Sequence, residues 1–169
     1  IGVFARLRLA EVEERTRFVA ETQLGSVAAL ESVTGTFALH RVSLRNVLLA
    51  PDQSARAAAR TVFEENARVL TGLLQEYGRS LISDERDRAL LNQVQNLSRQ
   101  YIAENRQVMA LADEGRPEDA RAQFRSTAGP TGVTLTRVVE EWVRYNKDLG
   151  TSSARDALAA IDTTRSRIL

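Results

Sequence analysis

The sequence predicts an all-α protein: an antiparallel up-down-up-down four-helix bundle whose long first and last helices extend beyond it as a stem. Apolar residues recur three or four positions apart along most of the chain, which is the period of an amphipathic helix. Helix-forming residues dominate the 169 positions, which include only 9 Gly and 3 Pro. The few helix-breaking positions divide the chain into four segments, and the outer two are the longer ones.

The ends of the predicted helices follow from local signals. Pro51 ends the first helix, because the residue before a proline avoids the α region. Ser83-Asp84-Glu85 supplies short polar side chains suited to capping the third helix, Gly115 is suited to ending it and Pro117 to opening the fourth. Pro130 predicts a kink or a short unwound segment at residues 128–130 of the fourth helix. The expected helices span residues 2–49, 53–81, 84–113 and 117–168.

The predicted core faces follow the spacing of the apolar residues. The face of the first helix includes Leu24, Leu30 and Phe37, and that of the second includes Val62, Phe63 and Leu70.

The helix lengths predict the stem. The two inner helices have about 30 residues, or roughly 45 Å, whereas the outer two have about 50 residues each. The excess lies at the two chain ends, which are neighbours in this topology, and makes a two-helix stem roughly 30 Å long. A domain between two membrane spans has this form; a cytosolic bundle with frayed ends is the alternative. No apolar run reaches the roughly 18–20 residues of a span, although residues 1–5 could be the end of one.

Composition argues against several classes of function. The 23 basic and 22 acidic residues leave a net charge of +1, which gives no electrostatic footprint for nucleic acid. The absence of Cys excludes disulfides, thiolate catalysis and Cys-ligated zinc. The single histidine, His40, has no Glu-x-x-His motif and no nucleophile elbow around it, and no phosphate-binding glycine loop is present. We therefore expect no cofactor, no metal site and no enzymatic activity.

The candidate site lies near the end of the first helix. Arg41 and Arg45 are four residues apart and so project from one helix face, beside the small residues Thr34 and Ala38. Two stacked guanidinium groups can bind a carboxylate bidentately and remain charged at any working pH. The alternative is that both are solvated or paired with acidic residues. We expect that simpler state for the other pairs, Arg99 with Arg106 and Arg121 with Arg125.

The predicted interruption of the fourth helix lies close in height to these arginines. Both features are within about 14 residues of a turn at the end of the bundle opposite the stem, so their heights differ by roughly 10 Å or less. A kink frees backbone groups for a ligand, and the hydroxyl of Thr131 can donate and accept a hydrogen bond. Thr131 is therefore expected to face the arginines.

Two stretches resemble the periplasmic four-helix-bundle sensor domain of bacterial chemoreceptors of the aspartate and serine receptor type. The family has Arg-x4-Arg-x3-Arg near the end of its first helix, where this chain has Thr36-x4-Arg41-x3-Arg45. The family also has a ligand-binding Pro-Thr in its last helix, followed by an aromatic residue and a Tyr. The corresponding residues here are Pro130, Thr131, Trp142 and Tyr145.

The departures from the family pattern concern the ligand. Thr36 replaces the first arginine, His40 replaces a ligand-contacting serine, and Ser126 and Thr127 replace an aromatic pair that holds an amino group in aspartate receptors. The resemblance therefore implies a carboxylate without an α-amino group: a small dicarboxylate, a tricarboxylate or an aromatic acid. The expected ligand-binding residues are Arg41, Arg45, Thr131, His40, Thr36 and Thr127.

The resemblance implies a single sensor domain over residues 1–169 of a methyl-accepting chemotaxis protein. We expect a periplasmic homodimer, attached to the inner membrane through flanking helices and signalling by a helix displacement on the order of 1–2 Å. Three alternatives remain: a sensor domain of a histidine kinase or cyclase, a bundle that binds a periplasmic partner protein, and, more remotely, a cytosolic enzyme.

Overall fold

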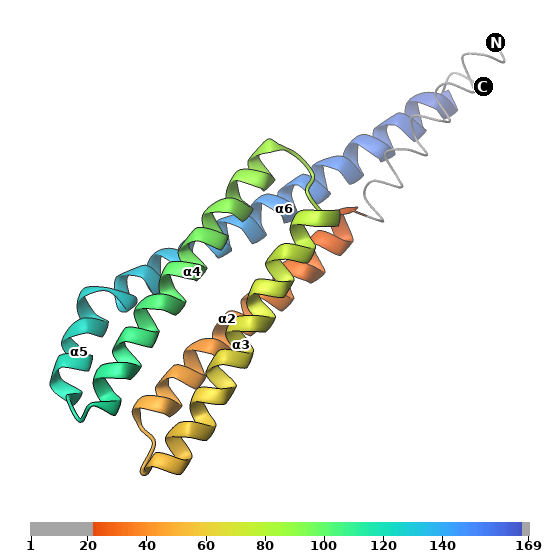
Figure 1. Cartoon of the computed structure of the whole chain (residues 1–169). Coiled ribbons are helices and arrows are strands. Elements are labelled where there is room, and N and C mark those ends of the chain that lie inside the picture. The colour runs from red at the N-terminus through yellow and green to blue at the C-terminus, as the bar shows by residue number, and fades with distance from the viewer. Residues whose placement is uncertain (1–21, 167–169) are drawn as a thin grey trace.

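A computed structural model describes residues 22–166 of the chain as helices joined by short turns. The helices are α2 (Leu24–Leu48), α3 (Gln53–Ser80), α4 (Glu85–Asp113), α5 (Pro117–Ser126) and α6 (Ala128–Ser166). α2, α3 and α4 run antiparallel to their successors, and α5 with α6 forms the fourth side of the bundle (Figure 1). This architecture confirms the predicted all-α four-helix bundle.

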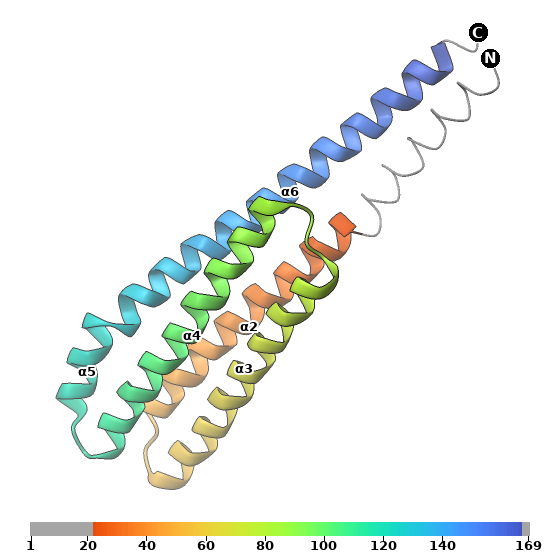
Figure 2. The ribbon, with the colours of Figure 1, turned by 45° about the horizontal axis from the view of Figure 1, so that its top comes forward.

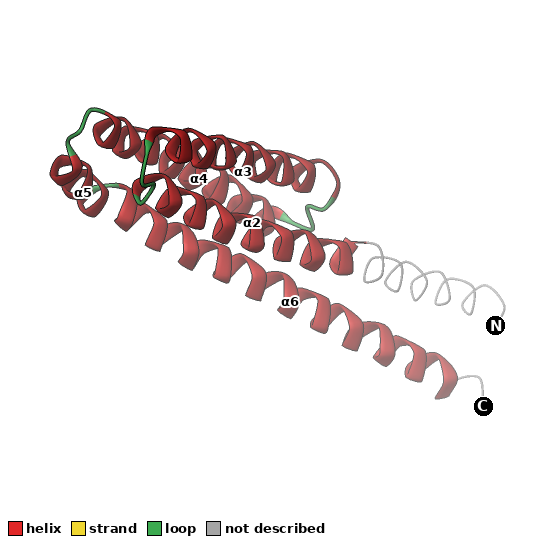
Figure 3. Ribbon diagram, turned by 90° about the horizontal axis from the view of Figure 1, so that it is seen from below, coloured by secondary structure: helices red, strands yellow, loops and turns green. Residues whose placement is uncertain are grey.

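The last helix extends beyond the bundle on the side of the α3–α4 turn (Figures 2 and 3). It has 39 residues, or roughly 58 Å, against 29 residues and roughly 44 Å for α4. One arm of the predicted stem is therefore present. The other arm, predicted at the start of the first helix, lies outside the described residues, as do residues 1–5 and 167–169. None of the described helices combines the length and apolar character needed to cross a membrane.

The predicted helix ends are largely confirmed, because the capping residues act locally. The carboxylate of Asp52 accepts a hydrogen bond from the backbone N–H of Ala55 at 2.8 Å, and Asp84 accepts one from Asp87 at 2.8 Å. Gly115 follows α4 in the left-handed conformation, with φ of 73°, which a side chain would strain. Pro117 occupies the first turn of α5, where no backbone donor is needed.

The interruption of the fourth helix differs from the predicted one. The chain leaves the helical conformation at Thr127, with φ −128° and ψ −80°, and residues 128–130 already belong to α6. Pro130 is therefore the third residue of α6, where its missing N–H costs no intrahelical hydrogen bond. The proline marks the start of a helix here and not a kink inside one.

The buried positions of α2 keep a three-and-four spacing that includes polar residues. They are Gln23 just before the helix, then Ser26, Leu30, Val33, Phe37, His40, Leu44 and Val47, with Ser43 also buried beside Leu44. This face corrects the predicted one at its start, where Leu24 is 66% exposed and the polar side chain before it points inward. Val62 of α3 is likewise 53% exposed, because the adjacent Phe63 occupies the inward position.

Candidate functional site

A groove of about 740 Å³ runs between α2 and α5, over the last turns of α4. Four arginines line it, two from each wall, and the remaining lining residues are apolar or aromatic. Among the residues that the structure describes, no acidic side chain lines it. The lining consists of Ala38, Arg41, Val42, Leu44, Arg45, Leu48 and Leu49 of α2 and its end, Tyr101 and Ala112 of α4, and Pro117, Ala120, Arg121, Phe124 and Arg125 of α5.

Arg41 and Arg45 form the α2 wall together with Ala38, as their spacing predicts. Both arginines are exposed, and within residues 22–166 neither side chain has an ion pair or a hydrogen bond. Burial raises the pKa of the neighbouring Tyr101, while Asn105 and the charge of Arg41 act in the opposite direction. The groove thus presents unneutralised positive charge beside an apolar surface, a combination suited to an anion that is partly apolar.

A second hollow, of about 360 Å³, continues from the groove toward the start of α6. Arg41, Tyr101 and Phe124 line both hollows. Its other wall comes from α6, with Ala128, Gly129, Gly132, Val133, Thr136, Arg137 and Glu140. The break between α5 and α6 therefore lies beside Arg41, as expected from the heights of the two features.

The structure does not place the threonines that were predicted to bind the ligand beside Arg41 and Arg45. Thr131 is 8% exposed and lines neither hollow; its hydroxyl lies 3.5 Å from the side-chain amide nitrogen of Gln100 on α4. The hydroxyl of Thr127 donates to the backbone carbonyl of Gln123 at 2.8 Å. Thr36 also lines neither hollow. Because α6 restarts after the break, its rotation places Gly132 and Thr136 at the hollow that Arg41 and Tyr101 line, and turns Thr131 toward Gln100 of α4.

His40 belongs to the core and not to the groove. Its side chain has no exposed surface, and its ring centroid lies 4.1 Å from that of Phe63 and 5.8 Å from that of Tyr101. Neither ring nitrogen has a hydrogen-bond partner in the described part of the chain. Burial, with Glu64 and Arg106 acting in opposite directions, lowers its pKa from 6.5 to about 4. The expectation that His40 shapes the ligand pocket directly is therefore wrong.

The other arginine pairs divide into paired and unpaired side chains. Arg106 forms an ion pair with Glu64 at 2.6 Å, and Arg121 forms one with Glu118. Arg99 donates to the side-chain carbonyl of Asn96 at 2.5 Å. Arg125 has neither an ion pair nor a side-chain hydrogen bond among the described residues. Two of these side chains are paired with acidic residues and the other two are exposed without an ion pair among the described residues, so all four fit the expected solvated or paired state.

A buried carboxylate that the sequence did not single out lies at the other end of the bundle, where α6 leaves it. Asp87 has no exposed surface and accepts hydrogen bonds from the Tyr77 hydroxyl at 3.0 Å, Trp142 Nε1 at 2.5 Å and Asn146 Nδ2 at 3.1 Å. The backbone N–H of Ser83 donates to its second oxygen at 2.9 Å. We call these five residues the Asp87 cluster.

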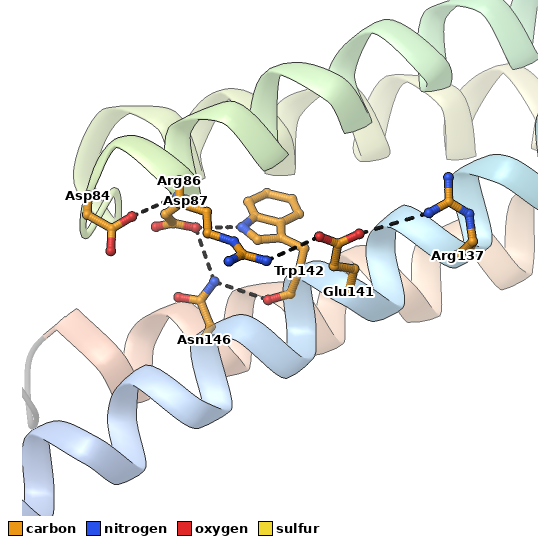
Figure 4. A network of polar contacts seen from close by, with 7 residues as sticks. All are labelled: Asp84, Arg86, Asp87, Arg137, Glu141, Trp142 and Asn146. Carbon is orange, nitrogen blue, oxygen red and sulfur yellow. Dashed lines mark hydrogen bonds and ion pairs between the residues drawn. The ribbon is translucent and has the colours of Figure 1, made fainter.

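The Asp87 cluster joins three helices and a turn. Figure 4 shows Asp87 of α4 facing Trp142 and Asn146 of α6, with the surface ion pairs of Glu141 alongside. Burial raises the pKa of the Tyr77 hydroxyl, so this group keeps its proton and donates it. No described Lys or Arg pairs with Asp87, so neutral donors alone stabilise the buried charge.

The fold and the groove define the class of the protein: a helical bundle with an extended last helix and a cationic groove on its side. Residues 1–161 match the family described as a four helix bundle sensory module for signal transduction, and the chain belongs to this family. No curated protein and no solved structure matches the chain. The protein is thus a sensory module, and of the six candidate residues Arg41 and Arg45 line its groove.

Proposed function

We propose that this sensory module is the extracytoplasmic domain of a transmembrane chemoreceptor, a methyl-accepting chemotaxis protein of the bacterial inner membrane, and that it binds a small carboxylate. Family membership supports the sensory role. The observation that carries the ligand class is the pair Arg41 and Arg45 on one groove wall, with no acidic residue lining the groove. Guanidinium groups prefer planar anions with which they can form two parallel hydrogen bonds.

The unpaired state of the two arginines favours a ligand over a protein partner. A pair already neutralised by acidic neighbours would have supported the alternative of a bundle that binds a periplasmic protein. In residues 22–166 neither Arg41 nor Arg45 has such a neighbour in an ion pair. An anion entering the groove therefore does not have to displace an internal carboxylate.

We further propose that two copies associate through α2. Leu39 on this helix is 59% exposed and lines neither hollow, so this large apolar side chain is available to a second copy. Association of two α2 helices would cover this apolar surface next to the groove. A ligand held between α2 and α5 would favour one relative position of the two helices, and a displacement on the order of 1–2 Å would pass from α5 along α6.

A thermal-shift screen of the chain against organic acids, amino acids and aromatic carboxylates tests the ligand class. A ligand at 100 times its Kd adds about 2.7 kcal/mol to the free energy of unfolding. For a domain of this size that raises Tm by about 5–10 °C. A selective rise with carboxylates supports the proposal, whereas a flat panel would contradict it.

Replacing Arg41 with alanine is expected to reduce this shift strongly. The loss of a charge-assisted contact weakens binding by about 10- to 100-fold, so a ligand at 100 times the native Kd is at only about 1 to 10 times the Kd of the variant and adds about 0.4–1.4 kcal/mol instead of about 2.7 kcal/mol. Because Arg41 is exposed and has no described ion pair, Tm without ligand should remain within about 2 °C of the native value. Arg68→Ala, which removes an exposed arginine of α3 paired with Glu65, is the matched control. An unchanged ligand shift in the Arg41 variant would refute the site.

A further inference from the structure

The α5 wall of the groove carries a second, different pair of arginines. Arg121 and Arg125 are four residues apart and both line the groove, opposite the α2 pair. Arg121 is paired with Glu118 on its own helix, whereas Arg125 has no ion pair or side-chain hydrogen bond within the described chain. The two walls together therefore present three unneutralised guanidinium groups: Arg41, Arg45 and Arg125.

The position of Arg125 along the groove matches that of the α2 pair. Its neighbour Phe124 lines both hollows together with Arg41 and Tyr101. Arg125, like Arg121, lines the first hollow and not the second. Arg125 is the last residue but one of α5, so it adjoins the junction with α6, whose first residues line the second hollow together with Arg41.

The fold leaves α5 as a short separate wall. It has ten residues, contacts α4 and α6, and is joined to α6 through the single non-helical residue Thr127. A side-chain hydrogen bond of 3.2 Å from Gln123 to Gln107 fastens it to α4. Packing on α4 and α6 therefore holds α5 in place, across the groove from the wall that α2 forms.

The floor between the walls is apolar. Val42 and Leu48 from α2, Ala112 from α4 and Ala120 and Phe124 from α5 separate the two sets of arginines. A ligand with polar groups throughout would have to leave water for this surface without gaining hydrogen bonds, which is unfavourable. An aromatic or aliphatic body would gain from the same transfer.

We propose, building on the function proposed above, that the groove takes an organic acid with an apolar body, and that Arg125 binds its carboxylate from the α5 wall. The body lies on the floor formed by Val42, Leu48 and Phe124. The carboxylate lies between Arg41 and Arg45 on one side and Arg125 on the other. Ligand binding then draws α5 and α2 together, because each wall holds the same anion.

The ligand class is tested by calorimetric titration with four acids. Benzoate and phenylacetate have an apolar body, whereas succinate and citrate do not. We expect the first two to bind about 10-fold more tightly or better, because the ring leaves water on binding. Tighter binding of succinate or citrate would overturn the apolar-body proposal but leave the carboxylate function intact. A failure of all four acids to bind would overturn both.

The role of Arg125 is tested by three variants on α5. Arg125→Ala should weaken benzoate binding about 10-fold, and Arg125→Lys should restore part of it, because lysine keeps the charge without the bidentate geometry. Arg121→Ala, the matched control from the same wall, should change affinity by less than about 3-fold, because its guanidinium is already paired. Equal affinity of native and Arg125→Ala proteins, with binding still weakened in Arg41→Ala, would overturn the role of Arg125 alone.

Discussion

Replacing Asp87 with alanine is expected to lower the free energy of unfolding by about 4 kcal/mol, because several buried donors would lose their shared acceptor. The side chains of Tyr77, Trp142 and Asn146 and the backbone N–H of Ser83 all donate to this one carboxylate. Each unsatisfied buried donor costs about 1–3 kcal/mol, and partial rearrangement or water entry reduces the sum. Thermal and urea denaturation of the native and variant chains measure the effect, with a fall in Tm of about 8–16 °C.

The matched control is another aspartate of α4. Asp113 is 39% exposed and pairs with Arg60 at 2.5 Å and Arg56 at 3.8 Å. Because exposed ion pairs contribute about 1 kcal/mol or less, Asp113→Ala should leave stability nearly unchanged. If Asp87→Ala does not fold, Asp87→Asn keeps the shape of the side chain and loses a smaller amount. A loss below about 1 kcal/mol in Asp87→Ala would show that the cluster does not stabilise this end of the bundle.

The location of the Asp87 cluster matters for signalling. It ties α6 to α3, α4 and the turn between them at the level where α6 leaves the bundle. A displacement of α6 alone would lengthen the hydrogen bonds of Trp142 and Asn146 to Asp87. We therefore expect α6 to move together with α4, so that α2 is the element against which a ligand-driven displacement takes place.

The fold could be predicted from the sequence to within one or two residues at most helix ends. Asp84 accepts a hydrogen bond from a residue three positions away, Gly115 takes the left-handed conformation and Pro117 occupies a position that needs no backbone donor, so local rules suffice. The observed break lies at Thr127 and not at the predicted kink, because the local sequence does not show whether a proline starts a helix or lies within one. Only the packing of α5 on α4 distinguishes them.

Only part of the candidate site could be predicted from the sequence, because helix geometry shows which residues share a face but not which face of another helix they meet. Arg41 and Arg45 share a face by helix geometry alone, and the structure places both on the groove. Which face of α6 meets them depends on how that helix is rotated after the break, and this rotation turned Thr131 away. Arg125 was expected, like Arg121, to be solvated or paired with acidic residues and not to bind a ligand, because the sequence does not show that α5 faces α2.

Polar core positions were the other omission, and a signal for them was present. The buried positions of α2 keep their three-and-four spacing through Gln23, Ser26 and His40, and those of α4 keep it through Asp87 and Asn105. If only apolar residues are taken as core positions, the regular spacing of buried positions is interrupted in both helices. If core positions are assigned from the three-and-four spacing before residue type is considered, His40 and Asp87 fall in the interior.

Acid is expected to destabilise the protein through His40. Its pKa is about 4 in the folded chain, against an ordinary value of 6.5, because the buried ring cannot be solvated when charged. Between these two pH values the unfolded chain binds a proton that the folded chain does not, so the free energy of unfolding falls as pH falls. The loss begins near pH 6.5, is complete near pH 4 and amounts to about 3 kcal/mol.

His40→Leu isolates this contribution. Leucine has a similar volume, removes two buried nitrogens without partners and cannot titrate, so the variant should be about 1 kcal/mol more stable at pH 7. The charged groups nearest the ring, Glu64 of α3 and Arg106 of α4, pair with each other in both proteins. Urea denaturation from pH 7.5 to 4 gives the two stability curves, and other carboxylates contribute equally to both. The curves should diverge by a further 3 kcal/mol or so toward pH 4; parallel curves would mean that the folded protein accepts the proton on His40 without cost.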